Sequence, residues 1–314
     1  MARDNQDLTK GPLARKILFF SAPLIVSNLL QVLFNVADIA VVGRFAGASA
    51  LGSVGSTTIL VTMFTSFLIG VSGGINVLTA LYLGSGDRKG VRETVHSAFL
   101  FSILTGLTLL LIGAIFSKDI LELLNTKPEL IDGAVLYIRI YFLGMPALAV
   151  YNFGNAVFSA AGDTKRPLKY LSMAGVVNII LNLFFVIVCK MDVAGVAVSS
   201  IISQYLSATM ISAALFRSRD IYGLRRSELR LNRNKTANII RIGIPAGLQN
   251  AIFQIANLFV QAGVNSFDAT MVAGNAAAAN ADALVYDVMT AFYTACGSFM
   301  GQNFGAGNRK RVRN

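Results

Sequence analysis

Length, composition and charge place this chain in a membrane. It has 314 residues, of which 54% are hydrophobic and only 14% are charged, and this is too apolar for soluble domains. The net charge of +11 is spread over short clusters between long apolar runs. This pattern excludes a domain-sized basic surface for nucleic acid and is typical of loops placed by their charge. We therefore expect no nucleic-acid partner.

Eight apolar stretches predict eight membrane spans, because about twenty apolar residues suffice to cross a bilayer. Helices are predicted, since a helix satisfies its own backbone hydrogen bonds in lipid. The first stretch is too long for the apolar core of a signal peptide, so it is predicted to remain as an anchor. The predicted fold is an all-α, polytopic helical bundle. Its spans lie near residues 17–42, 54–83, 95–116, 134–161, 168–188, 193–216, 239–264 and 270–299.

Positive charge predicts the orientation. The N-terminal segment, the second, fourth and sixth loops and the C-terminus carry four, three, three, seven and four Lys or Arg residues. The alternate loops carry one, two, one and none. Because Lys and Arg are enriched in cytoplasmic loops, both termini are predicted to be cytoplasmic in a multi-pass protein of the cell membrane. The seven cations of the sixth loop are assigned to topology, with anionic-lipid recognition as the alternative.

The chain contains an internal repeat. Residues 83–92 (LGSGDRKGVR) match residues 304–313 (FGAGNRKRVR) at six of ten positions. Three intramembrane pairs recur at nearly the same offset: Pro23 with Pro245, Asn28 with Asn250, and Asn35 with Asn257. Transporters are commonly built from such repeats, and these two copies are parallel because both begin on the same side. The second copy stops after two spans, so we expect a complete molecule of about twelve spans and a chain that lacks the last four.

The repeat predicts four regions. Residues 1–16 form a cytoplasmic N-terminal segment, and residues 17–216 form a first lobe of six helices. Residues 217–238 form a basic cytoplasmic loop, predicted to be the hinge between two lobes. Residues 239–314 begin a second lobe with two helices. A substrate would pass between the lobes.

A polar pocket is predicted in the first lobe. Asp38 lies inside the membrane, where a carboxylate is costly unless it is protonated, paired or hydrated, so a functional role is the default. Asn182 and Ser200 lie at a similar depth below the outer surface, and Asn178 lies one turn from Asn182 on the same face. These four residues could bind a cation, or move a proton as Asp38 titrates.

Two equivalent stripes of polar residues are predicted to line a central cavity. The spacing in each stripe places its residues on one face of a helix. The alternative is that the amides only join helices. The first stripe contains Asn28, Gln31, Asn35 and Asp38, and the second contains Asn250, Gln254, Asn257 and Gln261. Asp282, in the eighth span, is a further candidate for the cavity. Pro23 and Pro245 are predicted to bend their helices.

Other features exclude enzymatic chemistry. There is no phosphate-binding loop, so energy is expected from a gradient or from another subunit. His96 is the single histidine and is expected at the interface, which argues against a histidine-based metal site. Tryptophan is absent, so tyrosines such as Tyr137 are expected in the interfacial belt. Cys189 and Cys296 are predicted near opposite faces, which disfavours a disulfide.

The chain resembles the MATE (multidrug and toxic compound extrusion) family. The motifs that carry the likeness occur in order along the whole chain. They are DIAVVG at 38–43, GDTK at 162–165, NIILN at 178–182, GVA at 195–197 and GQNFGAG at 301–307. The resemblance implies twelve spans in two six-helix lobes and no enzymatic activity. It also implies antiport, in which Na⁺ or H⁺ enters while bulky, often cationic, drugs leave.

The resemblance also implies roles for individual residues. It gives Asp38, Asn178, Asn182 and Ser200 a part in cation or proton coupling, without a further metal site, and Pro23 a bending role. Many relatives have aspartate where this chain has Asn182, so the coupling ion is left open between Na⁺ and H⁺. The expected partners are the lipid bilayer and small organic cations. No cofactor is expected, and the full-length protein is expected to be a monomer.

Two other functions compete with drug efflux. A flippase for lipid-linked oligosaccharides, from the same broad superfamily, would require a cationic cavity for a pyrophosphate group, whereas the stripes here are amides and acids. A scaffold without transport activity would leave Asp38 and the repeated polar stripes unexplained. Efflux therefore ranks first.

Overall fold

The computed structural model describes residues 7–124, 126–264, 267 and 269–313. Every regular element in this part of the chain is a helix, as predicted. The long helices are α1 (Leu13–Val41), α2 (Gly47–Gly84), α3 (Arg88–Leu123), α4 (Pro128–Phe142), α5 (Met145–Ala160), α6 (Lys165–Leu183), α7 (Asp192–Arg217), α8 (Arg233–Val264) and α9 (Ala269–Gly305). Short elements are η1 (Val42–Ala46), η2 (Phe184–Val188), η3 (Arg226–Glu228) and α10 (Arg309–Arg313).

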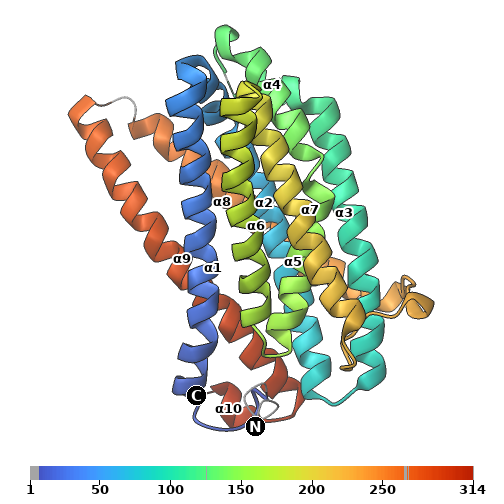
Figure 1. Cartoon of the computed structure of the whole chain (residues 1–314). Coiled ribbons are helices and arrows are strands. Elements are labelled where there is room, and N and C mark those ends of the chain that lie inside the picture. Colours follow the sequence, from blue (N-terminus) through green and yellow to red (C-terminus); the bar gives the residue numbers. More distant parts are fainter. Residues whose placement is uncertain (1–6, 125, 265–266, 268, 314) are drawn as a thin grey trace.

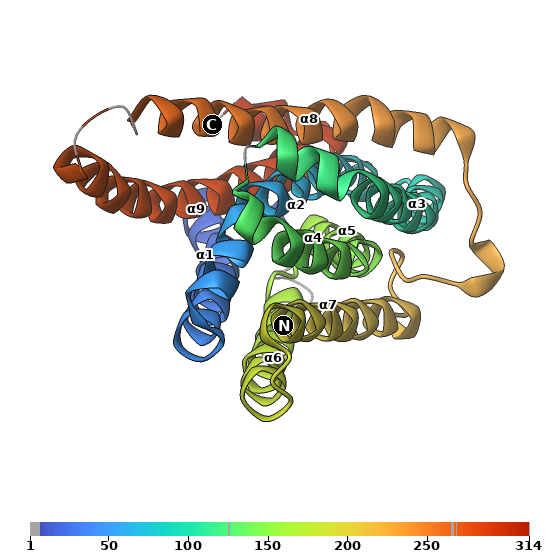
Figure 2. The same ribbon diagram turned by 90° about the horizontal axis from the view of Figure 1, so that it is seen from above.

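The helices form a bundle in which both ends of the chain lie at the same end (Figure 1). Viewed along the bundle, α8 runs along one side, while α1 and α6 lie on the opposite side (Figure 2). Five helical stretches among the described residues are long and apolar enough to cross a membrane. The α4–α5 pair adds a sixth if it counts as one broken span. α9 is not among these stretches, although it covers the eighth predicted span.

The predicted spans differ from the structure in two places. The first of the apolar stretches is helical without interruption over 72 residues, Leu13–Gly84. The chain between α1 and α2 is the π-helical turn η1 and not an open loop. The stretch contains two spans, since α2 returns toward the end where α1 began (Figure 1). The predicted single span 134–161 is broken after Phe142, and its two halves are bent by 47°. Gly144 and Pro146 stand at this break, and both residue types favour one.

The two copies of the repeat pack against each other in an equivalent way. The first repeat comprises α1–α7 and the second comprises α8–α10. The first helix of each repeat contacts the second helix of the other, as α1 with α9 and α8 with α2. Gly84 and Gly305 occupy equivalent positions, and a Cβ on each would strike the other repeat, at the carbonyl oxygens of Gln302 and Leu81 respectively. The packing thus supports a parallel repeat with an axis along the bundle.

Small residues allow α2 and α8 to approach closely. Gly70 on α2 faces Gly247 on α8, and Gly74 faces Gly243. The two glycines of each helix are four residues apart. A Cβ added at Gly74 would lie 2.7 Å from the Cα of Gly243. Such small-xxx-small pairs are typical of helix contacts in membranes, where backbones pack directly on each other.

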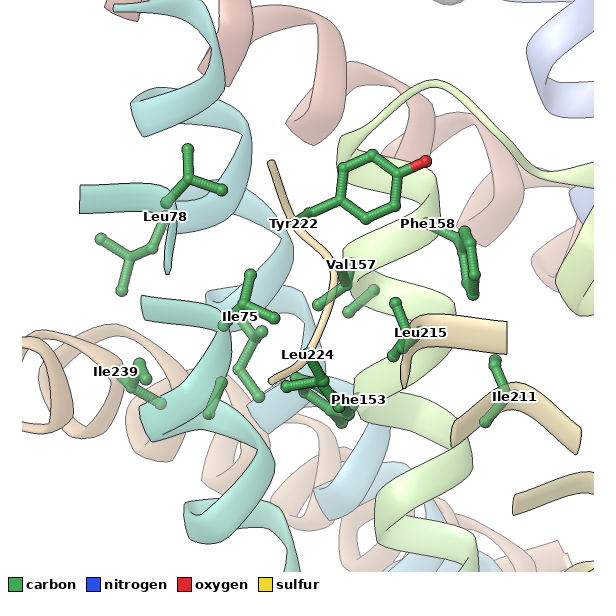
Figure 3. Packing of buried hydrophobic residues seen from close by; sticks show 14 of the residues in the cluster. Ile75, Leu78, Phe153, Val157, Phe158, Ile211, Leu215, Tyr222, Leu224 and Ile239 are labelled. Carbon is green, nitrogen blue, oxygen red and sulfur yellow. The ribbon is translucent and has the colours of Figure 1, made fainter. Parts of the chain in front are cut away.

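The inter-repeat loop, residues 218–232, is anchored in the first repeat. Tyr222 and Leu224 enter a buried cluster with Ile75 and Phe153, and they are 6% and 2% exposed (Figure 3). The backbone N–H of Leu224 donates to the carbonyl of Leu215 at 3.0 Å. The first part of the loop is therefore packed against the first repeat, and the hinge predicted for residues 217–238 stays a prediction.

His96 fixes the same loop. Its side chain, at the start of the third predicted span, is buried inside the protein and is 2% exposed. The backbone N–H of Arg225 donates to Nε2 at 2.9 Å, and Nδ1 lies 2.7 Å from the carbonyl oxygen of Arg92. Because Nε2 accepts a hydrogen bond, Nδ1 carries the proton and the ring is neutral. His96 thus joins α3 to the loop.

The N-terminal segment closes the end of the bundle where both termini lie. Leu8 is 2% exposed, and its N–H donates to Oε1 of Gln302 at 3.2 Å. Nε2 of Gln302 donates to the carbonyl of Ala160 at 2.7 Å, and Nδ2 of Asn303 donates to the carbonyl of Leu8 at 3.2 Å. This network ties the second repeat to α5 and to the N-terminal segment.

Candidate functional site

The structure brings together the four residues predicted for the first-repeat pocket. Asp38 lies near the end of α1, Asn178 and Asn182 lie one turn apart on α6, and Ser200 lies on α7. Nδ2 of Asn182 donates a hydrogen bond to Oδ1 of Asp38. The Ser200 hydroxyl donates to Oδ2 of Asp38 at 3.5 Å, and Nδ2 of Asn182 also lies 3.4 Å from Oδ1 of Asn178. Three helices therefore converge on one carboxylate.

The polar neighbours of Asp38 are buried and supply several oxygen atoms. Asn182 is fully buried, and Asn178 and Ser200 are 5% and 7% exposed. Oδ1 of Asn182 is buried without a hydrogen-bond partner among the described atoms, which is unfavourable unless a donor or a cation reaches it. Carboxylate, amide and hydroxyl oxygens are the ligands that hard cations prefer. The residues present therefore fit a small cation or a proton shared with Asp38.

Two tyrosines on α4 belong to the same region and were not predicted there. The rings of Tyr137 and Tyr141 stack with centroids 5.8 Å apart, and both residues lie close enough to interact electrostatically with Asp38. Tyr137 is 6% exposed, so its assignment to the interfacial belt was wrong. Proximity to a span end does not identify the face on which a side chain lies. The spacing of four residues, which places both rings on one face, was the available signal.

The deeper amides of the two polar stripes make equivalent contacts. Nδ2 of Asn28 donates to the carbonyl of Asp287 on α9 at 2.8 Å, and Nδ2 of Asn250 donates to the carbonyl of Ser66 on α2 at 3.3 Å. Asn250 repeats Asn28, and Asp287 repeats Ser66 at the offset that relates residues 304–313 to residues 83–92. Each amide therefore joins its helix to the other repeat, as expected for intramembrane amides that hold helices together.

The remaining stripe residues lie toward the other end of the helices. Nε2 of Gln254 lies 3.4 Å from the Ser66 hydroxyl, and Nε2 of Gln31 lies 3.4 Å from a carbonyl of its own helix. Asn35, Asn257 and Asp282 are exposed. These three side chains are free to meet a substrate, but the described contacts do not place them in a common pocket.

Both predicted prolines lie inside continuous helices, Pro23 in α1 and Pro245 in α8. A proline removes one backbone hydrogen bond of its helix. The Ser27 hydroxyl also donates to the carbonyl of Pro23 at 2.9 Å, a contact that competes with the helix hydrogen bonds and favours bending. The bending role of both prolines stays a prediction.

Comparison with known proteins identifies the family. The family model MatE matches residues 23–184 and 245–314. The probable multidrug resistance protein YpnP of Bacillus subtilis is 32% identical over 309 residues, which cover 98% of this chain and 68% of that protein. The FAD transporter of Shewanella oneidensis is 25% identical over 318 residues, covering 99% and 70%. The chain spans about two thirds of the length of these relatives.

Solved structures share the fold. A crystal structure of MATE in the bent conformation superposes with a TM-score of 0.90 at 22% identity, covering 98% of this chain and 69% of that one. An outward-facing multidrug resistance MATE transporter of the MOP superfamily gives a TM-score of 0.89 at 22% identity. The matched segments begin at Pro23 and Pro245, the repeated prolines, and thus follow the two copies of the repeat. The chain is a member of the MATE family, which consists of membrane transporters rather than enzymes.

Proposed function

We propose that the protein exports lipophilic, often cationic, organic compounds in exchange for Na⁺ or H⁺. The observation that carries this proposal is the Asp38 cluster. Asp38 is the one carboxylate in the first six predicted spans, and amide and hydroxyl groups of α6 and α7 contact it. The name of YpnP, a probable multidrug resistance protein, supports an organic substrate.

The chemistry of the cluster suits coupling. When a cation or a proton binds at Asp38, the charge of the carboxylate is neutralised, and the cost of keeping it in a low-dielectric region falls. Oδ1 of Asn182, which lacks a partner among the described atoms, gains one if the bound species is a cation. The loaded and empty states therefore differ in their contacts among α1, α6 and α7. A ligand can shift a conformational equilibrium only through such a difference.

Efflux is favoured over a flippase for pyrophosphate-linked sugars. The candidate cavity residues on α1, α8 and α9 are amides and acids, which suit a cationic or neutral compound. A pyrophosphate would require Arg or Lys in the same place. A scaffold role would give no reason for a partly buried intramembrane carboxylate that accepts hydrogen bonds from Asn182 and Ser200.

A dye-transport assay tests the proposal. The complete gene product is reconstituted into vesicles, and an inward Na⁺ or H⁺ gradient is imposed in separate experiments. We expect ethidium to move against its own gradient in at least one of them, and the active gradient identifies the coupling ion. Folded protein that moves no lipophilic cation under either gradient would contradict efflux.

The orientation has its own test, which uses the two native cysteines. Both are free and exposed, and Cys189 follows η2 at the predicted outer end of α6. In a Cys296→Ala background, a membrane-impermeant maleimide added to intact cells should label Cys189. Trypsin should cut at Arg225 and Arg226 only in inside-out vesicles, because these exposed residues lie in the predicted cytoplasmic loop. The reverse pattern would invert the topology.

A further inference from the structure

A second polar cavity lies far from Asp38, where the start of α3 meets the inter-repeat loop. Its volume is about 530 Å³, within the range of roughly 300–1,000 Å³ typical of small-molecule sites. Four of its nine lining residues are Arg or Lys and two are Glu. The lining consists of Arg88, Lys89, Arg92, Glu93, His96, Ser227, Glu228, Arg230 and Asn232.

The walls of this cavity are held in place by buried contacts. The loop wall is anchored in the core by Tyr222 and Leu224. The N–H of Asn232 also donates to the Ser97 hydroxyl at 2.9 Å, and this hydroxyl lies 3.4 Å from the carbonyl of Arg230. The loop is therefore bound to α3 through His96 and Ser97. The cavity is formed by fixed backbone and not by the chance position of a free loop.

The charges of the cavity do not cancel. Arg92 pairs with Glu228 at 3.5 Å, and Lys89 pairs with Glu93 at 4.0 Å. Both carboxylates are thus matched by a cation. Arg88 and Arg230 have no carboxylate partner among the described residues, and both are exposed. An excess of two positive charges remains, one on the helix and one on the loop.

Phosphate is the ligand chemistry that this excess fits. Guanidinium groups bind phosphate oxygens with two hydrogen bonds each. The N-terminus of α3 is already capped by Asp87, whose side chain accepts from the N–H of Gly90, so the attraction for an anion rests on the two guanidinium groups. We propose that the cavity binds a phosphate-bearing anion, with Arg88 and Arg230 as its principal contacts. The anion comes either from the headgroup of an anionic lipid or from a soluble phosphate compound. Either would link α3 to the loop that leads into α8.

The repeat supplies a matched control for the test. Arg309 and Lys310 are the equivalents of Arg88 and Lys89, and they lie on α10 outside the cavity. The test variant is Arg88→Gln/Arg230→Gln, and the control variant, Arg309→Gln/Lys310→Gln, removes the same charge. All four side chains are exposed, so we expect both variants to fold, and circular dichroism checks this.

Binding is measured in two arms. Inorganic pyrophosphate is titrated into the detergent-purified protein by calorimetry, and retention of phosphatidylglycerol over phosphatidylcholine is measured by native mass spectrometry. We expect saturable binding in one arm, weakened at least about tenfold in the test variant because hydrogen bonds to charged groups are among the strongest in proteins. The control variant should bind like the wild type. Binding of pyrophosphate would identify a soluble phosphate compound as the ligand, and retention of phosphatidylglycerol would identify a lipid headgroup.

Two results would overturn the proposal. One is the absence of binding by the wild type in both arms. The other is equal affinity in the test and control variants, which would mean that any binding follows the overall positive charge and not this cavity.

Discussion

Replacing Asp38 with asparagine is expected to abolish gradient-driven export while leaving the protein folded. The amide has nearly the same volume as the carboxylate, so packing against Asn182 and Ser200 persists. It also removes the burial cost of a charge. An amide does not change its charge, so it cannot take up a cation or a proton on one face and release it on the other. Dye efflux under an imposed gradient should therefore fall to the level of protein-free vesicles.

The control for this variant is Asp132→Asn, which removes an exposed carboxylate from α4. We expect wild-type transport from it, because it does not contact the Asp38 cluster. Dye binding, measured by fluorescence polarisation, should persist in both variants. If Asp38→Asn transports at the wild-type rate, the coupling site lies elsewhere, and Asp282 becomes the leading candidate.

The sequence predicted the helices and the repeat because both depend on local signals. Apolar length identifies most of these membrane helices, although α9 is not among the stretches found in this way. The predicted span 168–188 covers both α6 and η2, and the span 134–161 covers the broken pair of α4 and α5. The break in the helix after Phe142 was not predicted, although Gly144 and Pro146 are residue types that favour a helix break. An apolar count ignores such residues when the stretch around them stays hydrophobic.

The Asp38 cluster was predictable in part. Depth along each span placed Asp38, Asn182 and Ser200 at one level, and the structure joins them. Depth does not reveal which helix of a bundle stands beside which, so Tyr137 and Tyr141 were missed. Their neighbours are set by how α4 packs against α2 and α7, and the spacing of residues within one helix does not reveal this packing.

The polar stripes illustrate the same limit. Periodicity placed Asn28 and Asn250 on polar faces of their helices, but it could not tell a cavity from a helix contact. The structure gives each amide a backbone carbonyl of the other repeat as its partner. These two residues therefore help to hold the repeats together, and a part in substrate binding is left to the exposed Asn35, Asn257 and Asp282.

The contact between α2 and α8 leads to the second prediction. Gly74→Ala should destabilise the protein, because the new Cβ would lie 2.7 Å from Gly243 backbone atoms, which cannot move independently of α8. The two helices must separate, and we expect a loss of about 1–3 kcal/mol, as for other overpacked sites. Thermal unfolding in detergent, followed by circular dichroism, measures it.

The adjacent Gly73 is the matched control. A Cβ at Gly73 would meet nothing within 4 Å. Gly73→Ala should therefore leave the free energy of unfolding unchanged, or raise it by up to about 1 kcal/mol because alanine has a higher helix propensity than glycine. Equal stability of the two variants would show that the helices do not need their close contact. A double variant gives a sharper result. Once Gly74→Ala has separated the helices, Gly243→Ala should add less than its own single effect, because both substitutions act on one gap.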